Sequence, residues 1–203
     1  MRQFVIRCRS TPVHAERFLR TVGRAGHSEY LAHILVAGLF LAKGHREDTN
    51  VHLVLEKSRD LPRVLSISGA SLGSLAGLNE SSILGALADA LLAGAGRGSD
   101  AVSGAGIRCR ALSFERLLGE LAGAPILLDK DGPDVRESAV IVDPIFVMTD
   151  HTPMPAKVRK SMVSRGIARV SVGPRTLHAS QVVVLLHNEM DRRASFATSR
   201  IEE

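Results

Sequence analysis

The amino-acid sequence predicts an α/β fold with a mainly parallel β-sheet flanked by helices. In the last third of the chain, apolar runs alternate with helical periodicity, which predicts strands at 145–149 and 168–172 and helices at 156–164 and 180–191. Such alternation is typical of a parallel sheet covered by helices on both faces. The chain has 203 residues, of which 45% are hydrophobic, enough for one ordinary domain with its own core.

The first half of the chain supplies the other predicted elements. Alternating apolar residues predict an opening strand over 3–9, followed by a loop through Gly23 and Gly26. Ser28 is expected to cap a long helix that runs to Lys43 and stops at Gly44. Further strands are expected at 51–57 and 63–68, joined by a turn at 60–62.

The middle of the chain is expected to contain a second helix and a flexible loop. Asn79 is a plausible cap for this helix, and the spacing of five apolar residues predicts its buried face. The glycine-rich segment 93–106 has no Gly-Lys-Ser/Thr and no apolar strand before it, so a linker is a better interpretation than a phosphate-binding loop. Residues 194–203 are expected to fray. The apolar residues of the helix after Asn79 are Ile83, Leu84, Leu87, Leu91 and Leu92. After the glycine-rich segment, the expected elements are a strand at 107–110, a helix at 114–121 and a strand at 125–129.

The charge distribution favours a polyanionic partner. The formal net charge is +5, which on its own is also common in basic proteins that bind no nucleic acid. In the first 24 residues six arginines face only Glu16, and five cations lie in 157–169, which contains no acid. Two basic segments of this kind suit RNA. The aromatic content of 3% argues against recognition by an aromatic stacking platform.

Cysteine use and hydropathy exclude other classes. Cys8 and Cys109 are too few and too far apart for a metal cluster, so no metal site is expected. Two reduced thiols suit a cytoplasmic protein. The opening MRQFVIRCR lacks the apolar segment of a signal peptide, and the longest apolar stretch, 34–42, is too short to cross a bilayer. We therefore expect a cytoplasmic protein without a membrane segment.

Two turns in the last third are the best candidates for a site. Asp150-His151 follows the strand at 145–149, and Gly173-Pro174 follows the strand at 168–172. In open α/β sheets, ligands bind just beyond the carboxyl ends of the strands. Both turns also fit a purely structural interpretation, as a strand end and a tight turn before a helix.

The sequence lacks the familiar hydrolase and nucleotide-hydrolysis motifs. There is no GxSxG, HExxH or Walker sequence. His178 and His187 are nine residues apart on one predicted helix, so they do not form a metal pair. For each of them, a core histidine bonded to a carbonyl is the simpler interpretation.

In combination, the late segments resemble a known family. PIFVMTDHTPMP at 144–155, VSVGPRTLHASQ at 170–181 and VVVLLHNEMDR at 182–192 resemble the tRNA pseudouridine-54 N1-methyltransferases of the SPOUT superfamily, and are most similar to their bacterial relatives. With lower specificity, the resemblance covers the whole chain, including the opening MRQFVIR and Arg46-Glu47-Asp48. Two positions depart from the archaeal pattern, because Thr149 stands where those members carry glycine and Val182 where they carry cysteine.

The resemblance implies one domain over 1–203, with the part at about 125–192 threaded into a trefoil knot. It also implies a homodimer, a tRNA substrate and S-adenosylmethionine bound against three knot loops. An apolar slot would take the adenine, and glycine at 173 would let the backbone approach the cofactor. The implied cofactor residues are Leu128, Thr149, Ser171, Val172, Gly173, Leu177 and Val182.

The resemblance also suggests where the chemistry lies. A carboxylate could assist loss of the N1 proton of pseudouridine, and an arginine could stabilise the charge on the ring carbonyls. Asp150, Arg46 and Asp48 are the candidates, although Arg46 and Asp48 also fit an exposed ion pair beyond a helix end. The expected phosphate contacts are Arg24, Arg108 and Arg110.

Three functions stay open at this point. The leading one is N1-methylation of pseudouridine in tRNA. The second keeps the fold but changes the target to another RNA nitrogen or a ribose 2′-hydroxyl. The third is an RNA-binding knot protein without catalysis.

Overall fold

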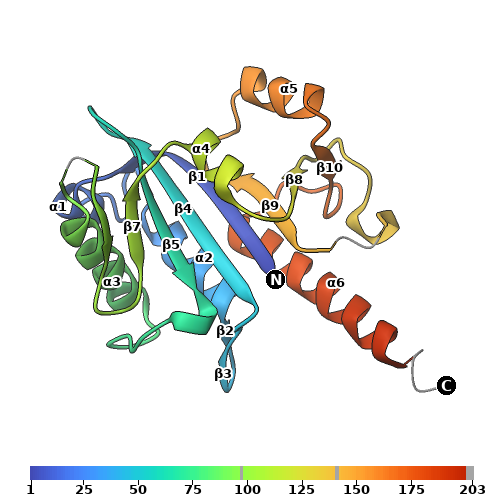
Figure 1. The fold of residues 1–203 in the computed structure, drawn as a ribbon, viewed down its shortest axis with the longest axis horizontal. Coiled ribbons are helices and arrows are strands. Elements are labelled where there is room, and N and C mark those ends of the chain that lie inside the picture. Colours follow the sequence, from blue (N-terminus) through green and yellow to red (C-terminus); the bar gives the residue numbers. More distant parts are fainter. Residues whose placement is uncertain (97, 140–141, 200–203) are drawn as a thin grey trace.

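The computed structural model describes residues 1–96, 98–139 and 142–199, and these form a mixed α/β fold (Figure 1). Its strands are β1 (Arg2–Pro12), β4 (Thr49–Lys57), β5 (Arg63–Ser68), β6 (Asp100–Val102), β7 (Arg108–Ala111), β8 (Ala124–Leu128), β9 (Pro144–Thr149) and β10 (Ala168–Val170), with a separate small hairpin of β2 (Phe40–Leu41) and β3 (Gly44–His45). Its α-helices are α1 (Ala15–Leu19), α2 (Glu29–Leu39), α3 (Glu80–Ala93), α4 (Phe114–Glu120), α5 (Ala156–Ser164) and α6 (Ala179–Ser199), and the 3-10 turns are η1 (Gly69–Ser71) and η2 (Val135–Glu137).

The eight strands of the large sheet lie in the order β10-β8-β9-β1-β4-β5-β7-β6. The pairs from β10 through β4 are parallel, whereas β5, β7 and β6 add antiparallel strands at the other side. The sheet is therefore parallel where the late part of the chain joins β1. The predicted α/β class and the mostly parallel sheet are confirmed.

Different helices cover the two faces of the sheet, and side chains that alternate along each strand pack against one group of helices or the other. On β1, Phe4 and Ile6 belong to one buried cluster with apolar residues of α1, α2, α3 and α6. Val5 belongs to a second cluster on the opposite face, with Leu117 of α4 and Met162 of α5. Figure 1 shows α4 and α5 on one side of the strands and α2 and α3 on the other. Two cores, one per face, thus fix the sheet.

The parallel register brings four strand ends to one edge. Arg7 of β1 lies opposite Thr149 of β9, and the N–H of Asp150 donates to the carbonyl of Arg7 at 3.4 Å. Val170 of β10 lies opposite Leu128 of β8. The loops that follow these strands therefore meet at this edge, where ligands bind in open α/β sheets.

The chain just after β10 is hydrogen-bonded on both of its sides. The N–H of Asp129 donates to Val170 O at 3.0 Å, whereas the N–H of Val135 donates to Ser171 O at 2.8 Å. Ser171 N–H in turn donates to the carbonyl of Pro133 at 2.7 Å. The loop after β8 thus lies against the far side of Ser171. A threaded segment needs such an arrangement, but the loop includes residues 140–141, outside the described part, so the knot stays a prediction.

The first predicted helix is shorter than expected. It ends at Leu39, and residues 40–45 turn into the β2–β3 hairpin, so Gly44 lies in a strand instead of stopping the helix. Ser28 makes no side-chain cap, because it already has helical backbone angles. The expected loop after the opening strand contains α1, whose Phe18 is buried against the core.

The second predicted helix and the loop after it are partly as expected. Asn79 caps α3 by accepting from the N–H of Ser82 at 2.9 Å. Leu92 was expected in the buried face but is 64% exposed, because it falls outside the stripe that meets the sheet. The sequence predicts a linker at 93–106, yet this segment contains β6, which pairs with β7 beyond it, and residue 97 lies outside the described part.

The C-terminal helix is also longer than expected. α6 continues to Ser199, so residues 194–199 are helical and were not expected to be, and residues 200–203 lie outside the described part. Within the described residues, no helix is both long enough and apolar enough to cross a bilayer.

Candidate cofactor and catalytic site

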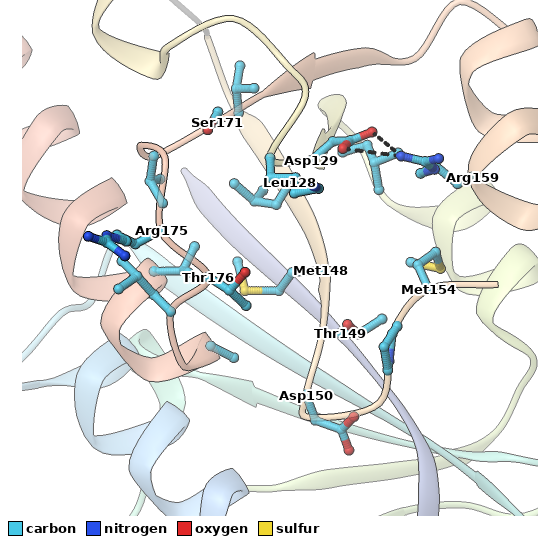
Figure 2. Close-up of a pocket in the computed structure, with 18 of the residues that line it drawn as sticks. Leu128, Asp129, Met148, Thr149, Asp150, Met154, Arg159, Ser171, Arg175 and Thr176 are labelled. Atoms are coloured by element: carbon cyan, nitrogen blue, oxygen red, sulfur yellow. Dashed lines mark hydrogen bonds and ion pairs between the residues drawn. The ribbon is translucent and has the colours of Figure 1, made fainter. Parts of the chain in front are cut away.

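A cavity of about 420 Å³ lies at the edge where β8, β9 and β10 end (Figure 2). This volume is within the range of small-molecule sites. The walls come from the loops after the three strands and from the start of α6. All seven residues that the sequence predicted for cofactor binding line it, together with Asp150: Leu128, Thr149, Ser171, Val172, Gly173, Leu177 and Val182.

One part of the cavity is apolar. Leu128, Val172 and Val182 are partly buried and pack against the main core, so their side chains have fixed positions. Met148 and Leu177 line the same cavity, and Met148 was missed from the sequence because it reads as an ordinary core residue of β9. A slot with such walls suits a flat, weakly polar ring.

The turn after β10 is held by its own side chain. Ser171 Oγ accepts from the N–H of Gly173 and donates to the carbonyl of Gly173, both at 3.1 Å. Gly173 has a φ of +133°, a conformation that other residues rarely adopt. A Cβ at this position would meet nothing within 4 Å, so the space beside the glycine is open. The turn therefore presents bare backbone to the cavity.

Another part of the cavity is charged. The side chain of Asp129, which follows β8, is buried and accepts from Arg159 at 3.3 Å and from Arg169 at 3.5 Å. Burial opposes ionisation, but the N–H of Asp131 and the two arginines outweigh it and lower the pKa of Asp129. Figure 2 shows Arg159 reaching from its helix to this carboxylate. The acid-free segment 157–169 is the only sequence signal for this cluster, and taken alone it predicts an RNA surface.

Asp150 lies at the turn after β9, in the same cavity wall (Figure 2). Its Oδ1 accepts from the N–H of Thr152 at 2.9 Å, and its side chain is only 1% exposed. Oδ2 is buried and makes no hydrogen bond among the described residues, and Nδ1 of His151 lies 3.4 Å from it. Burial raises the pKa of Asp150 above its ordinary value. A carboxylate of this kind is poised to take up a proton.

Arg46 and Asp48 lie elsewhere in the chain. They precede β4, which is parallel to β1 and β9, so they lie at the edge opposite Asp150. Arg46 donates two bonds to Asp191 of α6, at 2.7 and 3.1 Å, and Asp48 lies 3.5 Å from Arg2. The structure does not bring them together with Asp150 within one chain, and their catalytic role stays a prediction.

The three arginines expected to contact phosphate are not grouped. Arg108 makes two bonds to Asp100, at 2.5 and 2.7 Å, and Arg110 donates to Glu120 at 2.6 Å. Both lie on β7, which β5, β4 and β1 separate from β9. Arg24 is exposed, and its carbonyl accepts from the N–H of His27, whose ring lies 5.0 Å from the ring of His151 in the cavity wall. Of the three, Arg24 is the best placed.

The two histidines singled out in the sequence behave differently. His187 is buried, and its Nε2 bonds to the carbonyl of Gly38 at 2.9 Å, as expected of a core histidine. His178 precedes α6 and is exposed, with its ring 5.6 Å from that of Tyr30. The core interpretation is therefore confirmed for His187 and wrong for His178.

The fold and the cavity define an α/β protein with a small-molecule site at the ends of parallel strands. Residues 1–195 match the model of a family described as "Putative SAM-dependent RNA methyltransferase". The chain therefore belongs to this family of S-adenosylmethionine-dependent RNA methyltransferases, which confirms the predicted family and cofactor.

Curated relatives and a solved structure agree with this. The chain is 40% identical over 197 residues to a "Putative pseudouridine methyltransferase" of Vibrio cholerae, covering 95% of this chain and 98% of that protein. It is 43% identical to the protein of the same description in Vibrio parahaemolyticus, covering 95% and 99%. The crystal structure of Archaeoglobus fulgidus Nep1 bound to S-adenosylhomocysteine matches with a TM-score of 0.62 at 11% identity, covering 95% and 98%, which supports the fold.

Proposed function

We propose that this protein transfers a methyl group from S-adenosylmethionine to N1 of a pseudouridine in tRNA. The observation that carries the proposal is the Asp150 carboxylate, which is buried in the cavity wall with Oδ2 free of hydrogen bonds among the described residues. Pseudouridine has an N1–H where uridine has its glycosidic nitrogen. An acceptor for that proton is what the reaction requires from the protein.

The residues of the cavity fit the cofactor. Leu128, Val172 and Val182 offer an apolar slot for an adenine ring, and the bare turn at Gly173 allows close approach of the backbone. The cationic Arg159 suits the carboxylate of the methionine part. When bound, S-adenosylmethionine supplies a methyl group already activated on a sulfonium, so the protein chiefly has to position the nucleophile.

Asp150 would act as the proton acceptor. The carboxylate would take up the proton as the N1–H bond breaks, which would leave the N1 electron pair free to accept the methyl group that the bound cofactor would supply. The burial that raises the pKa of Asp150 makes it a better base than an ordinary carboxylate. Asp150 is thus proposed as the catalytic residue.

We also propose that the protein is a cytoplasmic homodimer with the C-terminal segment threaded into a knot. The outer sides of α2 and α6 support the dimer, because Val36 and Val184 are exposed on two helices that pack together. The loop that lies against Ser171 supports the knot.

In the proposed dimer, Arg46 and Asp48 could meet the Asp150 of the partner. Mixing Arg46→Ala and Asp150→Asn protomers tests this, because only a shared site would regain activity in mixed dimers.

The deciding experiment compares two tRNA transcripts that differ at one position, with pseudouridine or uridine at position 54. Protein and labelled S-adenosylmethionine are incubated with each, and the nucleosides are analysed by mass spectrometry after digestion. N1-methylpseudouridine from the first transcript alone is the expected result. A 2′-O-methylated nucleoside would establish the ribose alternative. Binding of both transcripts without methylation would favour the non-catalytic alternative.

A further inference from the structure

A second cavity, of about 300 Å³, adjoins the cofactor cavity. The two share Asp150, His151 and Ala179 as a common wall. On its other side the second cavity is lined by residues of α2, among them Tyr30, and by the start of α6. A group in the second cavity would therefore face the cofactor cavity across Asp150.

Aromatic rings gather around this second cavity. Tyr30, the only tyrosine of the chain, stacks on His27 with ring centroids 4.9 Å apart and an interplanar angle of 10°. The rings of His151 and His178 lie 5.6 Å from it, and His33 lies at 6.4 Å. His151 also meets His27 edge-on at 5.0 Å. One tyrosine and four histidine rings thus lie together, and all of them except His27 line the second cavity.

The polar groups of the cavity complement these rings. Asp150 Oδ2 is buried without a hydrogen bond among the described residues, so it can accept from an N–H. Gln181 lies on α6 and uses its side-chain oxygen to accept from the N–H of His178 at 3.0 Å. Its amide nitrogen can therefore donate to a carbonyl. Such a donor and acceptor match the N–H and C=O edge of a uracil-type base.

We propose that the second cavity binds the target base, extruded from the RNA, with its ring against Tyr30 and His178 and an N–H facing Asp150. Enzymes that act on a base take it out of the stack and hold it between aromatic side chains and hydrogen-bonding groups. This inference rests on the proposed function, because it names the substrate subsite of the same reaction. Tyr30 is a positioning residue, since it orients the base and does not take the proton.

A metal is a poorer occupant of this cavity. In the part of the chain that the structure describes, no group of three or more His, Cys, Asp or Glu side chains is arranged to hold a metal ion. His33 is paired with Glu80 at 3.2 Å, on the side toward α3. The ring arrangement around Tyr30 favours a flat organic ring over an ion.

The test measures two affinities in each variant. Tyr30→Ala, Tyr30→Phe and His178→Ala are compared with His14→Ala, an exposed histidine outside both cavities. Calorimetry with S-adenosylhomocysteine reports the first cavity, and KM for the pseudouridine-containing tRNA transcript reports the second. We expect Tyr30→Ala and His178→Ala to raise KM by about tenfold or to lower kcat, with cofactor affinity within about twofold of wild type. Tyr30→Phe keeps the ring and should retain most activity.

Each other outcome has a definite meaning. Unchanged KM and kcat in both alanine variants, with wild-type turnover intact, would overturn the base subsite and leave the proposed function standing. An equal loss of cofactor affinity would assign the second cavity to the cofactor instead. Wild-type protein that binds S-adenosylhomocysteine but methylates no RNA would overturn the proposed function, and the subsite with it. Since His178 is exposed, its variant keeps the test valid if Tyr30→Ala fails to fold.

Discussion

Asp150 Oδ2 and His151 Nδ1 lie 3.4 Å apart in the wall that separates the two cavities. Neither atom makes a hydrogen bond within the described residues. His151 Nε2 lies 3.1 Å from Ser10 Oγ, so the imidazole is held from its other side. The pair can therefore receive a proton from a bound substrate without first breaking a hydrogen bond of its own.

Replacing Asp150 by Asn should reduce kcat by about 100-fold or more, because an amide cannot accept the N1 proton. The cofactor cavity keeps its shape, so the Kd for S-adenosylhomocysteine should stay within about twofold, as measured by calorimetry. Asp89→Asn, on an exposed carboxylate of α3, is the control and should leave both values unchanged. Full activity of the Asp150→Asn protein would remove Asp150 from the mechanism.

The pH dependence of turnover should show the raised pKa of Asp150. The carboxylate is a base only when it has lost its proton, so kcat/KM should fall as the pH drops through that pKa. Because burial raises the pKa, the acid limb should lie above the ordinary value of 3.8. A kcat/KM profile of wild-type protein checks this, and the residual activity of Asp150→Asn should lack the limb.

Asp150→Asn should also make the protein more stable at neutral pH. A carboxylate with a raised pKa in the folded state favours folding less as the pH rises through that pKa, because the ionised form is better solvated in the unfolded chain. Asn keeps the bond from the N–H of Thr152 and carries no charge. Urea unfolding at pH 7.5 should show a gain, on the order of 1 kcal/mol, that shrinks at pH 4. A loss of stability at pH 7.5 would mean that the charge is compensated.

The sequence predicted the turns that line the cofactor cavity better than it predicted the second cavity, because each of these turns directly follows a strand that is visible in the sequence. Thr149, Asp150 and Gly173 sit where buried strands end, and the strands are visible as apolar runs. The second cavity could not be predicted in this way, because Tyr30 and His151 are 121 positions apart and meet only through the packing of α2 against the sheet edge. Arg46 comes to the site from the family resemblance alone, and the order of motifs along the chain does not say which edge of the sheet a residue occupies.

Gly173→Ala should weaken cofactor binding and destabilise the turn after β10. The φ of +133° is strained for alanine, which costs about 1 kcal/mol or more. Since the space beside Gly173 is open to the cavity, the new methyl group would enter the cofactor site instead of the core. Calorimetry should show at least a tenfold higher Kd for S-adenosylhomocysteine. Gly166→Ala, also at positive φ (+79°) but in the turn after α5, should cost stability without changing that Kd.

Acid should destabilise the fold through two buried histidines. Burial and nearby arginines lower the pKa of His52 and of His187 from 6.5 to about 4. As the pH falls, the histidines of the unfolded chain take up protons before those of the folded chain do. The contribution of the two neutral histidines to the free energy of unfolding should therefore be fully present above pH 6.5 and be lost as the pH drops toward 4. The shift corresponds to at most about 3 kcal/mol per histidine. Urea unfolding of His52→Gln should show a smaller loss between pH 7 and 4.5 than wild type, whereas His14→Gln should match wild type.

Arg193→Ala should loosen the loop that lies against Ser171. The Arg193 guanidinium donates to the carbonyls of Val135, Ser138 and Ala139, and its Nε donates to Glu189, so one side chain of α6 fixes the segment after β8. Removing it takes away all of these bonds, of which the two part-buried bonds to carbonyls, those of Val135 and Ser138, should matter most, at a cost of about 2 kcal/mol. Urea unfolding should report this loss, and hydrogen exchange should rise first at the N–H of Val135.

The neighbouring Arg192 is the matched control for this change. It is exposed on the same helix, so Arg192→Ala should alter the unfolding free energy by less than about 0.5 kcal/mol. Because Val135 N–H donates to Ser171 O, loosening the loop should also free the turn that forms one wall of the cofactor cavity. Arg193→Ala should therefore raise the Kd for S-adenosylhomocysteine although the residue lines neither cavity. Equal stability and equal Kd in the two variants would show that the loop holds its position without α6.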